Sequence, residues 1–256
     1  MNSKRQRCFN TTGTCDPKQH YMVRLDKRLT EIKDLVDNGK YFTINRARQF
    51  GKTTTLQALS EYLNHDYFVV SMDFQMQMSN AKFQTENRFS LAFAKAFVNS
   101  FQTNPDNKTA ENKSALTKFE ASWQSDPDEY ELVELFQSLS LLCSEMSTKV
   151  VLIIGEVDSA TNNQVFLDFL AQLRGYYLNR NRFSTFQSVI LAGVCDIKNL
   201  KRNLRPEEEH KDNSPWNRKS MTTLQVIHIW CPDCARFLKN NTRKIPKKMY
   251  GLIKDC

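Results

Sequence analysis

The sequence lacks any long apolar run. No stretch of about eighteen consecutive apolar residues occurs in its 256 residues, so no helix of the usual length could span a membrane. Residues 1–7 are basic, but no apolar stretch follows them, which excludes a secretory signal of the usual kind. We therefore expect a cytoplasmic protein with no membrane partner.

Cysteine and glycine are scarce, at seven residues each. The cysteines are odd in number and scattered through a chain with no export signal, so we expect reduced thiols rather than a disulfide framework. Cys143 and Cys195 lie in apolar surroundings and are predicted to pack as small core residues. Because glycine is so rare, a glycine at the required position of a sequence motif is unlikely to be there by chance.

A broad basic face is also missing from most of the chain. The net charge is +8, but residues 218–256 hold nine basic and two acidic residues and so carry seven of those charges. The rest of the chain is close to neutral, which argues against a nucleic-acid-binding face there. Nucleic-acid binding is therefore expected only through this basic tail, and a solvated chain end is the commoner meaning of such a cluster.

Short apolar runs predict four buried strands, over residues 41–45, 67–73, 149–154 and 188–193. Apolar residues at helical spacing predict helices between them, over 53–64, 84–102, 128–147 and 163–179, and another that ends at Asn38-Gly39. This alternation predicts an α/β fold with a parallel sheet, whose ligands bind at the carboxyl ends of the strands.

Two segments of this pattern allow more than one interpretation. The polar stretch 103–128, with Pro105 and Pro127, is interpreted as a surface excursion between two helices. Phe89, Phe93 and Phe97 form a stripe at a spacing of four, which favours a helix facing the core over a binding groove.

The strongest motif is Gly51-Lys52-Thr53, between the first predicted strand and the next helix. A phosphate-binding loop needs backbone N–H groups at a helix N-terminus, a lysine for the terminal phosphates and a hydroxyl for Mg²⁺. The alternative is a solvated basic turn, but strand, loop and helix fall where the mechanism requires them. We predict a nucleotide site formed by Arg46, Ala47, Arg48, Gln49, Phe50, Gly51, Lys52, Thr53 and Thr54.

The second half of such a site is expected after the strand at 149–154. P-loop enzymes that hydrolyse a nucleotide usually have Asp and then Glu at the end of this strand. The Asp holds Mg²⁺, and the Glu polarises the attacking water. Here the residues are Gly155 and Glu156, so Glu156 is the candidate general base and the Mg²⁺ carboxylate is missing. Either hydrolysis is impaired, which we favour, or a neighbouring carboxylate substitutes, from Asp158 or from Asp73.

Polar residues also follow the fourth predicted strand. Asp196 and Asn199 are candidates for sensing the terminal phosphate, although ordinary loop polarity and helix capping explain them equally well.

Four segments together resemble the prokaryotic AAA-like ATP-binding proteins, over residues 9–217: Asp26 to Leu29, Tyr41 to Thr55, Val150 to Asp158 and Asn213 to Asn217. The resemblance implies a P-loop NTPase three-layer sandwich of the additional-strand type, in which the fourth strand lies between the P-loop strand and the Glu156 strand. It also implies ATP and Mg as ligands, and Arg is usual at position 46 in that family.

The chain departs from the family pattern at Gly155 and after Asn217. We expect residues 1–40 to be a lead-in with a helix, 41–217 the nucleotide-binding domain, and 218–256 a basic tail, a truncated or frame-shifted lid. Cys231-x-x-Cys234 in the tail could be half of a zinc site, but coincidence is the commoner explanation.

Three functions follow from these patterns. The first is an ATP-dependent switch or ATPase with impaired hydrolysis; the second is a nucleotide-binding module that does not hydrolyse its ligand; the third is nucleic-acid binding through the tail. A protein partner and an oligomeric state are not indicated by any motif. An arginine finger is likewise open among Arg46, Arg48, Arg202 and Arg205.

Overall fold

A computed structural model describes residues 8, 10, 15–16, 18–45, 51–104, 109–160 and 162–193, together with the backbone of 224–228. Several predicted residues lie outside this part of the chain: the loop residues 46–50, Asp196, Asn199, Cys195 and the Cys231–Cys234 pair. Within the described residues, no helix is both long and apolar enough to cross a membrane.

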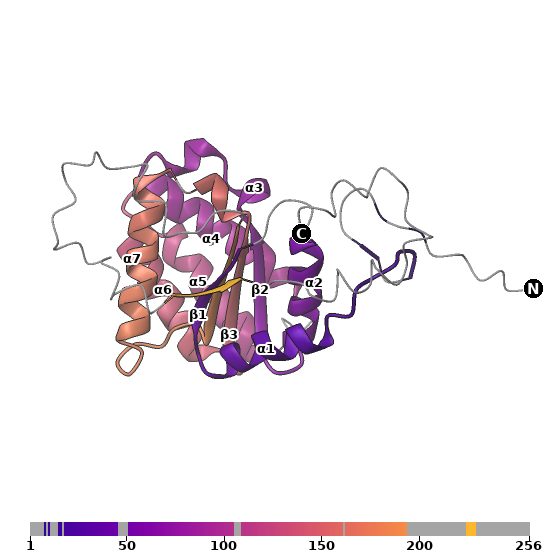
Figure 1. The fold of residues 1–256 in the computed structure, drawn as a ribbon. Helices are drawn as coiled ribbons and strands as arrows, with labels where there is room; N and C mark the ends of the chain where they lie inside the picture. The colour runs from indigo at the N-terminus through magenta and orange to yellow at the C-terminus, as the bar shows by residue number, and fades with distance from the viewer. Residues whose placement is uncertain are drawn as a thin grey trace, which may run out of the picture.

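The centre of the fold is a parallel sheet between helices (Figure 1). Its strands follow the order β2-β3-β4-β1-β5. The strands are β1 (Tyr41–Asn45), β2 (Phe68–Asp73), β3 (Val150–Gly155), β4 (Ser188–Gly193) and β5 (Leu224–His228). The first four match the predicted strands within one residue. β4 lies between β1 and β3, which confirms the additional-strand order expected from the family resemblance.

β5 was not predicted. It pairs in parallel with β1, with Leu224 opposite Tyr41 and His228 opposite Asn45. The sheet therefore includes backbone from the range 218–256 that the sequence analysis assigned to a basic tail.

Helices cover both faces of the sheet (Figure 1). α1 (Asp26–Asp37) and α2 (Lys52–Leu63) pack on one face, against Phe42, Ile44, Val151 and Ile153. α4 (Glu86–Thr103), α5 (Ala110–Gln124), α6 (Leu132–Glu145) and α7 (Gln164–Leu178) form the layer on the other face. The three-layer α/β sandwich was thus correctly predicted.

The aromatic stripe of α4 lies inside this second layer. Phe89, Phe93 and Phe97 are completely buried, and Phe101 continues the row one turn later. The rings of Phe89 and Phe93 both contact Phe169 of α7, at centroid distances of 5.2 and 5.0 Å. The stripe is core, as the sequence analysis favoured, because a helix that buries one face must direct every fourth residue inward.

α5 lies within residues 103–128, the stretch interpreted as a surface excursion, where no helix was predicted. Its N-cap, Thr109, accepts a hydrogen bond from the Asn112 backbone N–H at 3.2 Å. Only a narrow stripe of α5 is apolar and buried: Ala115, Leu116 and Phe119. Phe119 contacts Phe97 of α4, which docks the helix on the core.

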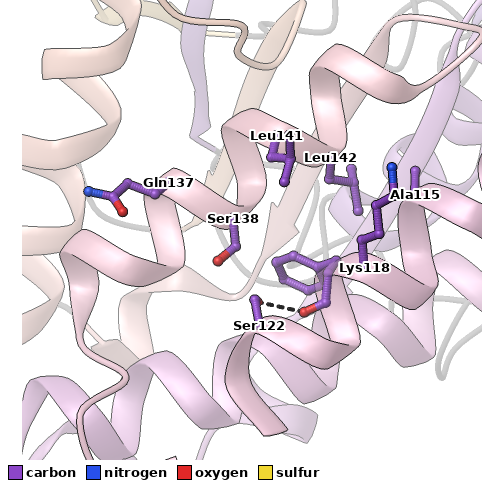
Figure 2. A pocket seen from close by; sticks show the side chains of 8 residues that line it. Ala115, Lys118, Ser122, Gln137, Ser138, Leu141 and Leu142 are labelled. Carbon is purple, nitrogen blue, oxygen red and sulfur yellow. Dashed lines mark hydrogen bonds between the residues drawn. The ribbon is translucent and has the colours of Figure 1, made fainter. Parts of the chain in front are cut away.

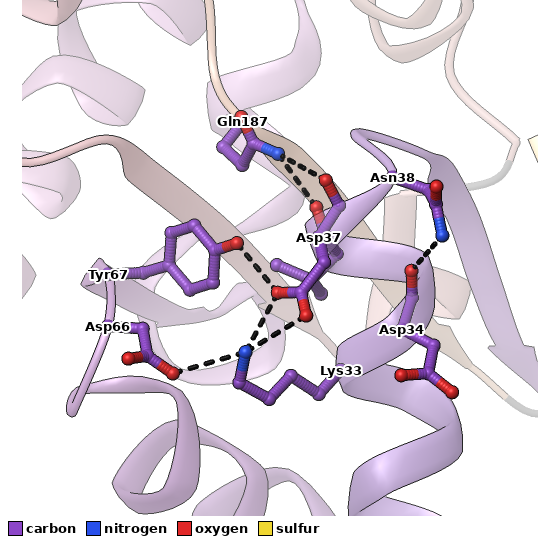
Figure 3. Close-up of polar contacts among 8 residues, drawn as sticks. Lys33, Asp34, Asp37, Asn38, Asp66, Tyr67 and Gln187 are labelled. Atoms are coloured by element: carbon purple, nitrogen blue, oxygen red, sulfur yellow. Dashed lines mark hydrogen bonds and ion pairs between the residues drawn. The ribbon is translucent and has the colours of Figure 1, made fainter.

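Polar contacts join α1 to the edge of the sheet where the strands begin (Figure 3). Lys33 forms ion pairs with Asp37 at 2.9 Å and with Asp66 at 3.1 Å, and the Tyr67 hydroxyl donates to Asp37 at 2.7 Å. Gln187, just before β4, donates to the carbonyls of Val36 and Asp37. The end of α1 is therefore joined to the starts of both β2 and β4.

The outer edge of β2 is covered by two asparagines. Asn104, at the end of α4, donates from Nδ2 to the Val69 carbonyl at 2.8 Å and to Asn64 Oδ1 at 3.0 Å. Asn64 Oδ1 also accepts from the Val69 N–H at 3.3 Å. Side chains thus satisfy backbone groups that an edge strand would otherwise offer to another chain.

Two further short helices lie in the loops that follow the carboxyl ends of the strands. They are α3 (Phe74–Gln77), directly after β2, and the 3₁₀ helix η3 (Val157–Ala160), after β3. A third, the 3₁₀ helix η1 (Asn80–Phe83), precedes α4.

Candidate nucleotide site at the ends of β1, β3 and β4

Gly51 begins the site where α2 leaves the loop after β1. Its φ of +70° is left-handed, a conformation that glycine adopts without the steric cost of a side chain. The Gly51 carbonyl accepts hydrogen bonds from the Thr55 backbone N–H at 2.9 Å and from the Thr55 hydroxyl at 2.8 Å. The glycine thus sets the turn that opens α2, with the helix N-terminus available to an anion.

Lys52 and Thr53 follow with contrasting environments. The Lys52 side chain is 7% exposed, and its Nζ lies 3.0 Å from Glu156 Oε1. Thr53 is exposed, so its hydroxyl is accessible. The structure therefore brings the predicted phosphate lysine and the predicted general base into direct contact, although they are separated by more than a hundred residues.

Thr54 contacts a segment that sequence reasoning did not connect with the site. Its Oγ1 accepts a hydrogen bond from the Cys15 backbone N–H at 3.1 Å. Asp16 holds the following turn, because its carboxylate accepts from the Lys18 backbone N–H and from the Gln19 side chain, both at 2.8 Å. No motif around Cys15 signalled this contact, which depends on the path of the chain before α1.

Glu156 has an unusual backbone. Its φ is +54°, the only positive φ of a non-glycine residue within the described part of the chain. Non-glycine residues in this region are strained and cluster at functional sites. With this backbone, the Glu156 side chain reaches Lys52 from the residue between the end of β3 and the start of η3.

Gly155 stands where a metal-binding carboxylate was expected, and it faces α2. A Cβ built there would meet Leu56 Cδ1 at 3.5 Å and the Met72 carbonyl at 3.6 Å, which are ordinary contacts. The position therefore has room for a Cβ on the side of the sheet that α2 covers, but glycine supplies no side chain.

Asp158 lies elsewhere, over the end of β4. Its two carboxylate oxygens are each 3.0 Å from the position that a Cβ of Gly193 would occupy. Gly193 is opposite Asn45 in the register of β4 with β1. The Asp158 carboxylate thus occupies the end of the strand between β1 and β3.

These residues fit the phosphates of a nucleotide better than they fit a metal ion. A helix N-terminus, a glycine turn and a buried lysine provide the donors that phosphate needs. For Mg²⁺ the described residues offer the Thr53 hydroxyl, and they contain no cluster of three or more His, Cys, Asp or Glu side chains arranged to hold a metal.

A separate cavity of about 190 Å³ lies between α5 and α6 (Figure 2). None of the predicted site residues lines it; its walls are Ala115, Lys118, Phe119, Ser122, Gln137, Ser138, Leu141 and Leu142.

The thiol of Cys143 packs against the core as predicted, and burial raises its pKa to about 12, so it is protonated at neutral pH.

A parallel sheet in this strand order, with a glycine–lysine–threonine helix start beside a strand-end glutamate, defines a P-loop ATPase fold. Residues 19–201 match the family described as "Predicted AAA-ATPase", and the chain belongs to this AAA-ATPase-like family. Among solved structures it is similar to the Walker-type ATPase PABY2304 of Pyrococcus abyssi, with a TM-score of 0.53 at 14% identity over 93% of this chain. The similar region spans 64% of the Pyrococcus chain, less than two thirds of its length.

A second similar structure is that of Drosophila ORC bound to DNA, with a TM-score of 0.48 at 11% identity, covering 84% of this chain and 32% of that one. No curated protein matches the chain.

Proposed function

We propose that this protein binds ATP through residues 46–54 and acts as an ATP-dependent switch or ATPase whose hydrolysis is impaired. The observation that carries the proposal is the buried Lys52 at the start of α2, 3.0 Å from Glu156 at the end of β3. Phosphoryl transfer in P-loop proteins uses a lysine at the phosphates and a second residue that orients the attacking nucleophile, and this structure brings a candidate for each together.

Each residue has a role that its position allows. The Lys52 ammonium pairs with phosphate oxygens, the backbone of the loop and of Gly51 supplies N–H donors, and the Thr53 hydroxyl is the Mg²⁺ ligand. Mg²⁺, when bound, supplies positive charge at the phosphates. Glu156 accepts a proton from the attacking water.

Impairment follows from Gly155. Mg²⁺ requires near-ideal octahedral geometry, so the position of each carboxylate matters. Asp158 remains a proposed alternative ligand, but its carboxylate lies at the end of β4, whereas the Cβ position of Gly155 faces Leu56 of α2. This separation favours a slow enzyme or, as the second candidate, a module that binds nucleotide without hydrolysing it.

The test is stabilisation by nucleotide. Saturating ATP with Mg²⁺, at about a hundred times its Kd, should stabilise the wild-type protein by roughly 2.7 kcal/mol. Lys52→Ala should abolish the thermal shift, whereas Lys40→Ala, at an exposed lysine just before β1, should retain it. A shift that survives Lys52→Ala would contradict the site; a shift without phosphate release would select the non-hydrolysing module.

Nucleic-acid binding through the tail is a separate proposal, and β5 changes how it must be tested. Deleting 218–256 would remove a strand paired with β1. Replacing Lys244, Lys247 and Lys248 by serine instead should weaken any salt-sensitive DNA or RNA binding while leaving β5 in place.

A further inference from the structure

The phosphate lysine already has an anionic partner within the chain. Lys52 Nζ lies 3.0 Å from Glu156 Oε1, and the two side chains are 7% and 29% exposed. We propose that Glu156 is an internal competitor of the nucleotide: its carboxylate and the phosphates interact with the same ammonium group, so nucleotide binding must weaken or displace the ion pair. This inference rests on the proposed nucleotide site and concerns its regulation.

The backbone holds the competitor in place. Glu156 follows the last residue of β3 and adopts φ +54°. Its carbonyl accepts hydrogen bonds from Ser159, from the backbone N–H at 3.3 Å and from Oγ at 3.0 Å. Val157 and Ala160 anchor the same turn, with exposures of 1% and 0%. The fold therefore fixes the backbone position from which the Glu156 side chain reaches Lys52.

Burial makes the competition effective. A lysine that is 7% exposed has little water to replace a lost partner, and a charge at such a site is strongly disfavoured when it is left unpaired. A phosphate that approaches Lys52 competes with Glu156, because two anions at one ammonium repel each other and each weakens the contact of the other. A weakened contact with Lys52 leaves the Glu156 carboxylate freer to act on water, so the general base becomes more available when phosphate arrives.

Glu156→Gln isolates this effect, because it removes the charge and keeps the shape. The measurement is the Kd of ADP in EDTA, which excludes both hydrolysis and the contribution of a metal ion. We expect Glu156→Gln to bind ADP roughly threefold to tenfold more tightly than wild type, the range of a partly buried ion pair. Without nucleotide it should melt at a lower temperature, because Lys52 loses its charged partner.

Asp158→Asn is the matched control. It removes one carboxylate from the same turn, but Asp158 lies over Gly193, and the Lys52 ion pair is formed by Glu156. Equal tightening by both variants would show general repulsion of phosphate and overturn the inference. So would unchanged or weaker ADP binding by Glu156→Gln, or an unchanged melting temperature without nucleotide.

The outcomes separate this inference from the proposed function. If wild type and Glu156→Gln both fail to bind ADP and ATP, the nucleotide site itself is contradicted. If wild type binds nucleotide through Lys52 but Glu156→Gln shows no gain, the nucleotide site stands and only the competition is wrong.

Discussion

Gly155, the last residue of β3, lies directly opposite Asp73, the last residue of β2. Both positions belong to the sheet face covered by α2, because Val69 and Val151, at an equivalent pair of positions in the same register, pack there together. The carboxylate of Asp73 is therefore on the neighbouring strand, β2. That strand lies about 4.8 Å farther from β1 than β3, which carries position 155. Asp73 is also engaged in capping α3, since its Oδ1 accepts from the Met76 N–H at 3.1 Å.

The first prediction is that Gly155→Asp raises phosphate release by roughly tenfold or more, because a carboxylate on the α2 side is a much better Mg²⁺ ligand than none. The new Cβ meets only ordinary contacts, with Leu56 and Met72. Steady-state phosphate release in Mg²⁺ and ATP measures the effect. Gly155→Asn is the isosteric control and should gain much less; equal rates in wild type and Gly155→Asp would show that Gly155 is not the defect.

A second prediction concerns Gly193 and Asp158. Gly193→Ala places a Cβ 3.0 Å from both carboxylate oxygens of Asp158, which is tighter than most real Cβ contacts, so the carboxylate must shift by a few tenths of an ångström. We expect a loss of about 1–2 kcal/mol in the free energy of unfolding. In an Asp158→Ala background the same change should cost clearly less. Urea unfolding of wild type, the two single variants and the double variant measures the coupling energy between positions 158 and 193. Additive effects would show that the carboxylate does not need the space at Gly193.

Asn104→Ala tests the covered edge of β2. Asn104 is 6% exposed, and its loss leaves the Val69 carbonyl without its side-chain donor. The expected cost is about 1–3 kcal/mol of unfolding free energy, together with a greater tendency to aggregate through the exposed edge. Asn38→Ala is the control, because that exposed side chain donates to a helix-end carbonyl, of Asp34. Comparable losses in the two variants would argue against a special role for the β2 edge.

The Asp37 cluster predicts a pH dependence. Partial burial tends to raise the pKa of Asp37, but hydrogen bonds from Tyr67 and Lys33 outweigh it and hold this pKa below its usual value. The folded pKa is depressed, so the stabilisation is complete above about pH 4 and is lost as the pH falls through the folded value. Asp37→Asn should cost about 1 kcal/mol at pH 7, a figure reduced for exposure. The cost should shrink in acid; a constant difference from pH 7 to pH 2.5 would contradict this origin.

The sequence predicted those parts of the fold that consist of apolar runs. β1, β3 and β4 are completely buried or nearly so, and such strands are recognisable without any partner. α5 was missed because three buried residues among charged neighbours give weak periodicity. β5 was missed because it lies in a basic stretch and is stabilised by pairing with β1, which local pattern does not show.

In the candidate site, too, some features could be predicted from local sequence, and others depend on the fold. Gly51, Lys52, Thr53 and Glu156 could be predicted, because a phosphate loop requires those residue types next to a strand end and a helix start. The Lys52–Glu156 ion pair could not, since it depends on the left-handed backbone of Glu156. The position of Asp158 over Gly193 depends likewise on the order of strands in the sheet.

The placement of β1 has a consequence for how the protein is made. Tyr41 in β1 pairs with Val189 on one side and with Leu224 on the other, so both neighbours of this strand come from far later in the chain. During synthesis, which proceeds from the N-terminus, β1 has neither of these partners until most of the polypeptide has left the ribosome. Long-range pairing of this kind folds slowly. β1 is thus synthesised early, but the strands that pair with it are synthesised late, and its apolar residues are unpaired in the interval.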